Sequence, residues 1–216
     1  MRRGLRDPAT AIKKDNINNN KLITKKLVKR NKKEIINNKI EIPYIKTPSM
    51  KKYTLILDLD KTLSYKNNKT GEIILRNGLF SFLSTIRPFY EIISFSLESK
   101  IFCDSIMNMI EQDKKYFDYK FYKEHSILYK NNLVKDISLI GRDISKIIIV
   151  DDDEVCFKLN KENGIKIASF NGENNNDNKL FELKRILRQI FIENYEDVRI
   201  ALKNYKLEII NKITLD

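Results

Sequence analysis

The 216-residue sequence contains two cysteines, one histidine and no long apolar run. Cys103 and Cys156 do not form a disulfide framework or a CxxC metal site, so we expect reduced, half-buried thiols. His125 has no neighbour that would make it a base or a metal ligand, and we expect a structural role for it. No segment approaches the roughly 18 apolar residues of a membrane-spanning helix, so we expect no such helix in this chain.

The net charge of +12 is confined to the start of the chain. Of the 41 basic and 29 acidic residues, 16 and 4 lie in residues 1–52, which leaves 25 of each sign in residues 53–216. The neutral charge of residues 53–216 argues against a nucleic-acid-binding domain, and a nucleic-acid-associated role would rest on the basic tail alone.

Residues 1–50 show no sustained hydrophobic period, and we expect a mostly disordered tail of which Ile40–Tyr44 could pack on the domain. This basic tail could lie on an anionic membrane surface or remain solvated. Its first residues, MRRGLR, have the arginines of a mitochondrial targeting segment but lack serine and an amphipathic period.

Apolar strands alternate with amphipathic helices after residue 52. Runs typical of buried strands are Tyr53–Leu57, Tyr90–Phe95, Lys146–Val150 and Ile165–Ser169. Helical spacing of apolar residues predicts helices over residues 78–86, 102–110, 177–194 and 196–206. Residues 66–71 are expected to form a polar turn, and Asn131–Asn132 is the turn signal of a small hairpin insertion. The alternation predicts an α/β fold with a doubly wound, mostly parallel sheet over residues 51–207 and a C-terminal tail over 208–216.

Two aspartates, Asp58 and Asp60, directly follow the first strand, where a core would normally exclude them. Residues two apart in an extended chain project to the same side. Two buried carboxylates repel each other and need a compensating cation, and oxygen ligands at a strand end favour Mg²⁺. The acidic run after a later strand would add Asp152 as a ligand, with Asp151 as its support. Asp60 would contribute its backbone carbonyl to the same site.

These aspartates, together with Ser96 and Lys135 beside other strand ends, could take part in phosphoryl transfer from a serine or threonine ester. Asp58 would attack phosphorus, and Asp60 would protonate the leaving alkoxide and then activate water. The Ser96 hydroxyl and the Lys135 ammonium would hold phosphate oxygens. Each residue alone has an ordinary explanation as a helix cap, a surface lysine or a solvated loop, so the hypothesis depends on their order and spacing.

The string LDLDKTL at residues 57–63 resembles the DxDxT signature of haloacid dehalogenase-type phosphatases, in the branch of the RNA polymerase II C-terminal-domain phosphatases. Arg-Asn-Gly at residues 76–78, YEIISFS and LVKDISLIGRDISKIIIVDDD extend the resemblance over about residues 53–170. It implies a Mg²⁺-dependent phosphoprotein phosphatase with Asp58 as nucleophile and Asp60 as general acid and base. It also implies phosphate binding by Thr62, Ser96 and Lys135. Asp152 stands where these phosphatases usually have Asn, which keeps an oxygen ligand.

The flanking segments resemble the presequence receptors of the mitochondrial inner-membrane translocase, the Tim-fifty family. The similar strings are FYKEHSILYKNN, FKLNKENGIKIASFNGENNNDNKL and EDVRIALKNY. This resemblance implies a component of the mitochondrial inner membrane or intermembrane space, or of a relict organelle, that binds presequence peptides and other translocase subunits. Many members have lost the first-motif aspartates, whereas Asp58 and Asp60 remain here. The resemblance of the flanking segments makes a translocase component our first hypothesis. The retained aspartates keep a cytoplasmic or nuclear phosphatase acting on a phosphoprotein as the alternative.

Overall fold

The computed structural model describes residues 40–67, 69–173 and 176–215, which belong to one compact unit. The predicted basic tail over residues 1–50 lies largely outside the described residues, as do the arginines at its start. Among the described residues, none of the helices is long and apolar enough to cross a membrane.

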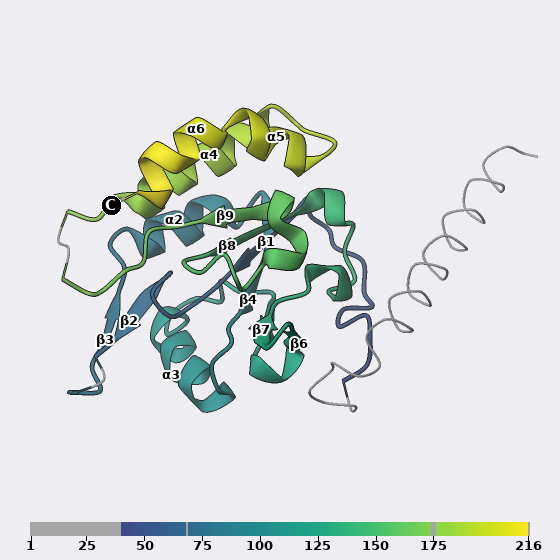
Figure 1. Cartoon of the computed structure of the whole chain (residues 1–216). Helices are drawn as coiled ribbons and strands as arrows, with labels where there is room; N and C mark the ends of the chain where they lie inside the picture. The colour runs from purple at the N-terminus through teal and green to yellow at the C-terminus, as the bar shows by residue number, and fades with distance from the viewer. Residues whose placement is uncertain (1–39, 68, 174–175, 216) are drawn as a thin grey trace, which may run out of the picture. The chain divides into compact units, whose positions relative to one another are not determined.

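Five parallel strands form the central sheet in the order β5-β4-β1-β8-β9 (Figure 1). Their bounds are Tyr53–Leu57 for β1, Tyr90–Phe95 for β4, Tyr119–Phe121 for β5, Ile147–Asp151 for β8 and Gly164–Lys166 for β9. Every residue of β1, β4 and β8 is buried, as expected for strands that are covered on both faces. Leu57 pairs with Ser94 on one side and Val150 on the other, so these three strands end at one edge. The predicted α/β fold is confirmed.

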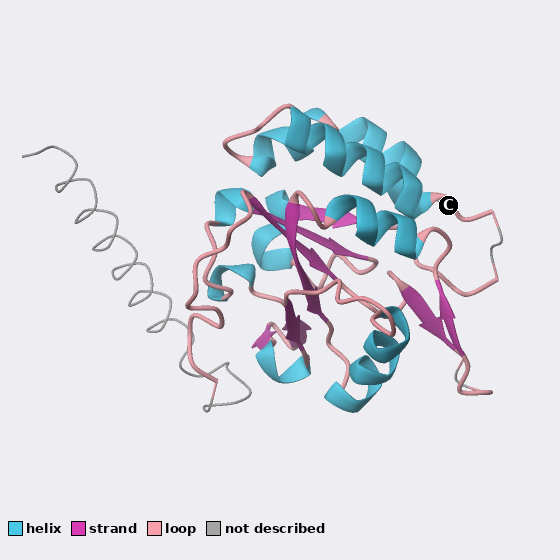
Figure 2. Ribbon diagram, turned by 180° about the vertical axis from the view of Figure 1, so that it is seen from behind, coloured by secondary structure: helices cyan, strands magenta, loops and turns pink. Residues whose placement is uncertain are grey.

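The two faces of the sheet are covered by different kinds of element. Side chains alternate along β1, so Leu55 and Leu57 join a large core cluster while Ile56 joins a smaller one. The large cluster contains residues of α2 (Leu79–Ile86), α3 (Lys100–Ile110), α4 (Lys179–Ile192), α5 (Val198–Asn204) and α6 (Lys206–Ile209). The smaller cluster takes residues from loops and from the 3₁₀ helices η2 (Ile137–Leu139) and η3 (Ile144–Lys146). Two further 3₁₀ helices adjoin it: η1 (Lys123–His125), whose His125 contacts Phe121, and η4 (Lys158–Asn163), which follows Phe157. Figure 2 shows the strands between the C-terminal helices and the loops of the opposite side.

Two antiparallel hairpins lie outside the sheet. Strands β6 (Ile127–Tyr129) and β7 (Asn132–Val134) form the predicted insertion. Their loop residues Lys130 and Asn131 have φ of 48° and 63°, the left-handed conformation that a two-residue hairpin loop requires. The second hairpin pairs β2 (Ser64–Lys66) with β3 (Ile73–Leu75) around the predicted polar turn, in which the Gly71 N–H donates to the Asn67 carbonyl at 2.8 Å. The sequence did not predict its two strands.

The packed core continues past both ends expected for the domain. At the N-terminal side, Ile45 is buried, and the backbone N–H groups of Tyr44 and Ile45 donate to the carbonyls of Leu139 and Ile140 at 2.9 Å. Tyr44 also packs edge-on against His125, whose Nδ1 accepts the Tyr122 N–H, so the histidine has structural contacts. At the C-terminal side, Ile209 and Ile213 belong to the large core cluster, and a π-helical turn, η5 (Ile210–Thr214), follows α6.

The last strand is shorter than the predicted segment Ile165–Ser169, because β9 ends at Lys166. Beyond it, the Ala168 N–H donates to the Ile213 carbonyl at 2.8 Å instead of to a neighbouring strand. The residues from 168 onward therefore form a loop that leaves the sheet beside β8.

Candidate active site

Asp58 and Asp60 leave the sheet at the carboxyl end of β1. The Asp58 N–H donates to the Val150 carbonyl at 3.0 Å, so strand pairing continues into the first aspartate. A tight turn follows, in which Lys61 has φ of 58° and donates its N–H to the Ser64 carbonyl at 2.6 Å. Asp58 is consequently buried, whereas Asp60 is partly exposed.

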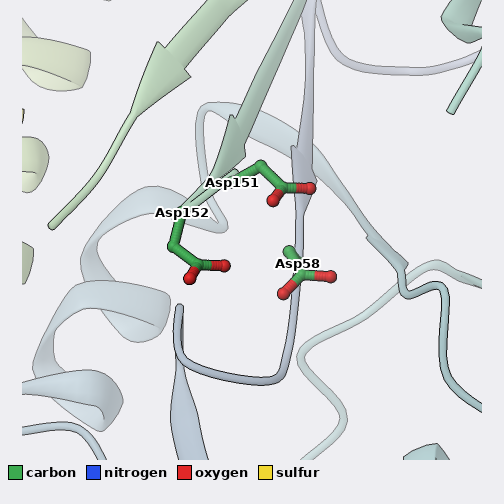
Figure 3. A group of neighbouring side chains, drawn as sticks. All are labelled: Asp58, Asp151 and Asp152. Carbon is green, nitrogen blue, oxygen red and sulfur yellow. The ribbon is translucent and has the colours of Figure 1, made fainter. Parts of the chain in front are cut away.

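Three carboxylates, those of Asp58, Asp151 and Asp152, form a group at this edge (Figure 3). One oxygen from each lies within 4.8 Å of the others. Strands β1 and β8 are neighbours, and their ends deliver Asp58 beside the acidic pair. The Asp60 carboxylate is not part of this group, so only its backbone carbonyl is left for the metal role predicted from the sequence.

Lys135 lies between two of these carboxylates. Its Nζ is 2.6 Å from Asp58 Oδ1 and 2.6 Å from Asp151 Oδ2, and its side chain is 1% exposed. The segment after β7 carries it, held by a hydrogen bond of 2.6 Å from the Lys135 N–H to the Cys156 carbonyl. When all three carboxylates are ionised, the Lys135 ammonium neutralises one of them and two negative charges remain. A divalent cation would neutralise these two charges.

The donor set suits Mg²⁺, because all three side chains offer oxygen. Lys135 engages one oxygen of Asp58, and the Ser169 hydroxyl donates to Asp152 Oδ2 at 2.8 Å. Among the described residues, nothing is hydrogen-bonded to the second oxygen of either carboxylate. Mg²⁺ takes few carboxylates and keeps waters and phosphate oxygens, so these residues could hold it with room for a substrate.

Burial shifts the pKa values of the site. Desolvation raises the pKa of Asp58 to about 8, with Lys135 opposing the shift and Asp151 adding to it. Desolvation also raises the pKa of Asp60 and of Asp152. For Lys135, desolvation lowers the pKa, but the two neighbouring carboxylates outweigh it and raise the pKa above its usual range. A raised pKa at Asp60 suits a carboxyl group that must be protonated near neutral pH to act as an acid.

All three predicted phosphate-binding residues, Thr62, Ser96 and Lys135, are buried. Ser96 follows β4, and its Oγ accepts the Glu98 N–H at 3.2 Å. Thr62 is completely buried, and its hydroxyl has no hydrogen-bond partner among the described residues. Within that part of the chain, neither hydroxyl is hydrogen-bonded to the three carboxylates. The structure therefore joins Lys135 to the three carboxylates, and the phosphate contacts of Thr62, Ser96 and Lys135 stay predictions.

The sequence did not indicate that Arg76 supports the segments that border the site. Its side chain is fully buried, and its guanidinium donates to both carboxylate oxygens of Asp177 at 2.8 to 3.1 Å. It also donates to the Thr62 carbonyl at 3.1 Å and the Ala168 carbonyl at 2.9 Å. The string Arg-Asn-Gly marked this residue as family-like, but its partner lies 101 residues away, beyond any local pattern.

The two cysteines are free and buried. Desolvation raises the pKa of Cys103 to about 11 and also raises that of Cys156. Thiols with raised pKa values are poor nucleophiles, and both side chains are more deeply buried than the half-buried thiols expected from the sequence.

Comparison with known proteins shows which protein family this chain is similar to. The family described as NLI interacting factor-like phosphatase matches residues 53–199. The chain is 31% identical over 164 residues to CTD small phosphatase-like protein 3 of Caenorhabditis elegans, covering 68% of this chain and 57% of that protein. It is 32% identical over 162 residues to the mitochondrial import inner membrane translocase subunit TIM50 of Candida glabrata, covering 73% of this chain and 33% of that protein. The solved structure of Fcp1, an essential RNA polymerase II CTD phosphatase, aligns with a TM-score of 0.47 and 17% identity over 72% of this chain and 53% of that chain.

The relative named as a phosphatase and the relative named as a translocase subunit match this chain at similar sequence identity. Sequence identity therefore does not distinguish between these two branches of the family. The chain also spans only a third to somewhat more than half of these relatives' lengths. The family match itself covers more than half of the chain and includes Asp58, Lys135 and Asp151. The chain belongs to the family of NLI interacting factor-like phosphatases.

Proposed function

We propose that the protein is a Mg²⁺-dependent phosphatase that hydrolyses phosphoserine or phosphothreonine esters of a protein substrate. The main support for this proposal is the buried Lys135 ammonium between Asp58 and Asp151, with the Asp152 carboxylate beside them. Each buried carboxylate costs several kcal/mol unless it is compensated, so a fold without chemistry at this edge would gain stability from apolar residues instead. The surviving charges support the phosphatase more directly than the translocase hypothesis.

The reaction begins with attack of the Asp58 carboxylate on phosphorus. The ester P–O bond breaks, Asp60 gives its proton to the departing alkoxide, and an aspartyl-phosphate forms. Lys135 donates to Asp58 Oδ1 and so fixes the orientation of the carboxylate before attack. Mg²⁺, when bound, would keep Asp58 ionised despite its raised metal-free pKa, and it would offset the charges that otherwise keep a phosphate anion away from a carboxylate.

A second displacement regenerates the enzyme. Asp60, now ionised, accepts a proton from water, the water oxygen attacks phosphorus, and the bond between phosphorus and Asp58 breaks. Inorganic phosphate and the free Asp58 carboxylate result. The partly exposed position of Asp60 supports this role, because the same group must meet an alkoxide and then a water molecule.

The test is hydrolysis of p-nitrophenyl phosphate with and without Mg²⁺ by the wild type and two variants. Asp58→Asn should lose at least about a thousandfold in kcat, because the amide is not a nucleophile. Asp143→Asn is the matched control, because Asp143 is exposed and precedes β8 at the opposite edge of the sheet. Wild-type activity in Asp58→Asn would reject the assignment, provided that thermal melts show both variants folded.

A second candidate function is a component of the mitochondrial inner-membrane translocase that binds presequence peptides. Its support is the similarity to TIM50 subunits and the predicted EDVR motif at residues 196–199. In the structure this motif caps α5, since the Asp197 carboxylate accepts the Arg199 N–H at 2.9 Å. Fractionation of cells and binding of a fluorescent presequence peptide test the candidate, and a protein found outside mitochondria or their relicts would contradict it.

A further inference from the structure

Ser169 lies in the loop that follows β9 and borders the carboxylate group. The Ile167 N–H donates to the Asp151 carbonyl at 3.0 Å, and the chain then turns away from the sheet. The Ser169 Oγ donates to Asp152 Oδ2 at 2.8 Å. Within the described part of the chain, no other side chain is hydrogen-bonded to Asp152, whereas Asp58 and Asp151 both accept hydrogen bonds from Lys135. Asp152 is thus oriented by a partner of its own.

The loop around Ser169 is held by three separate parts of the fold. The Ala168 N–H donates to the Ile213 carbonyl at 2.8 Å, from the C-terminal π-helical turn. The Phe170 N–H donates to the Lys61 carbonyl at 2.7 Å, from the turn that carries the first-motif aspartates. The buried Arg76 guanidinium donates to the Ala168 carbonyl at 2.9 Å. The residues on both sides of Ser169 are therefore fixed, so its hydroxyl is presented to Asp152 from a rigid frame.

We propose that Ser169 is a positioning residue for Asp152. By donating to Oδ2, it fixes the torsion of the carboxylate and leaves the other oxygen for Mg²⁺. A carboxylate without such a donor rotates over a broad range, because the terminal torsion of Asp has no sharp minima. Hydrogen-bond partners of metal-ligating groups are typically worth about 10- to 100-fold in metal affinity or activity. This inference rests on the proposed Mg²⁺ site and adds a residue to it.

The experiment measures Mg²⁺ binding to the full chain by calorimetry and by the shift of the thermal midpoint, with the metal alone as the probe. Ser169→Ala should raise the Kd for Mg²⁺ about tenfold or more. Ser169→Thr keeps the hydroxyl and should restore the affinity to within about threefold of the wild type. The matched control is Ser145→Ala, because the Ser145 Oγ donates to Asp143 Oδ1 at 2.8 Å in an exposed pair at the opposite edge of the sheet. It should leave the Kd unchanged.

The same variants separate binding from chemistry during p-nitrophenyl phosphate hydrolysis. Because Ser169 acts through Asp152, the Mg²⁺ concentration for half-maximal activity should rise in Ser169→Ala, and kcat at saturating Mg²⁺ should recover most of its wild-type value. A Kd in Ser169→Ala equal to that of the wild type would overturn the role of Ser169 and leave the phosphatase proposal standing. A wild type that neither binds Mg²⁺ nor is stabilised by it would overturn the metal site and this inference together. A loss in Ser169→Ala that Ser169→Thr fails to restore would also overturn it, because the hydroxyl would then not be the cause.

Discussion

Replacing Lys135 by Met tests the charge balance of the site most severely. Met has a similar length and shape, so the change removes the ammonium and leaves most of the packing. Lys135 makes two ionic hydrogen bonds of 2.6 Å, to Asp58 and Asp151. Bonds to charged groups are worth about 1.5–3 kcal/mol each, and breaking a buried ion pair costs about 3–5 kcal/mol. We therefore expect a loss of about 4 kcal/mol in the free energy of unfolding.

The loss should depend on pH and on Mg²⁺. Lys135 lowers the pKa of Asp58, so in the variant that pKa lies above the wild-type value of about 8, and a proton can replace the missing ammonium. The loss should therefore grow as the pH rises above 8, where Asp58 is ionised in the wild type and must give up this proton in the variant. Mg²⁺ should stabilise Lys135→Met more than the wild type, because the variant carries one more uncompensated charge. Domains of this size lose about 2–4 °C of Tm per kcal/mol, which predicts a Tm lower by about 8–16 °C in the metal-free variant.

Urea denaturation followed by circular dichroism measures the effect, first with a chelator and then with Mg²⁺. The control is Lys100→Met, which makes the same substitution at an exposed lysine paired with Asp104. Its unfolding midpoint should stay close to that of the wild type, because exposed ion pairs contribute little. If Lys135→Met and Lys100→Met unfolded at the same urea concentration at about pH 9, the buried charge group would not exist as described.

Two further predictions follow from the aspartates. Burial raises the pKa of Asp58 from 3.8 to about 8, so its contribution to stability is present below about pH 4 and is lost as the pH rises toward 8. The metal-free wild type should therefore resist urea better at about pH 5 than at about pH 8, and an equal difference in Asp58→Asn, which cannot titrate, would refute the assignment. Asp60→Asn should reduce kcat/KM, which depends only on the steps up to formation of the aspartyl-phosphate, about 10²- to 10⁴-fold for a phosphoserine peptide but much less for p-nitrophenyl phosphate, whose leaving group needs little protonation. Equal losses for the two substrates, compared by steady-state kinetics, would exclude Asp60 as the acid.

The carboxylates could be found from the sequence because each directly follows an apolar run. Buried strands are visible as such runs, and parallel neighbours end at one edge, so Asp58 and Asp151 were expected to meet. Lys135 was also expected at this site, although its contact with both carboxylates was not. Its partners depend on the path of the chain after β7, which no local pattern specifies.

The contacts of Arg76 and Ser169 and the β2–β3 hairpin could not be predicted in the same way. The pairing of Arg76 with Asp177 joins residues that are 101 positions apart. Ser169 was expected to end a strand, but the hydrogen bond from Ala168 to Ile213 takes the chain out of the sheet before it. The hairpin of β2 and β3 has strands of three residues without buried alternation, so a turn was the simpler expectation. Each miss concerns a contact decided by distant parts of the chain.

In the proposed mechanism the phosphoryl group is transferred to Asp58, and trapping this covalent intermediate is the decisive test. Asp60→Asn supplied with Mg²⁺ and radiolabelled p-nitrophenyl phosphate should form the aspartyl-phosphate and hydrolyse it slowly, because the second step lacks its base. After an acid quench, we expect label on the protein that neutral hydroxylamine releases, and none on the double variant that also carries Asp58→Asn. Label that persists in the double variant, or wild-type turnover without any labelled protein in Asp60→Asn, would contradict the account.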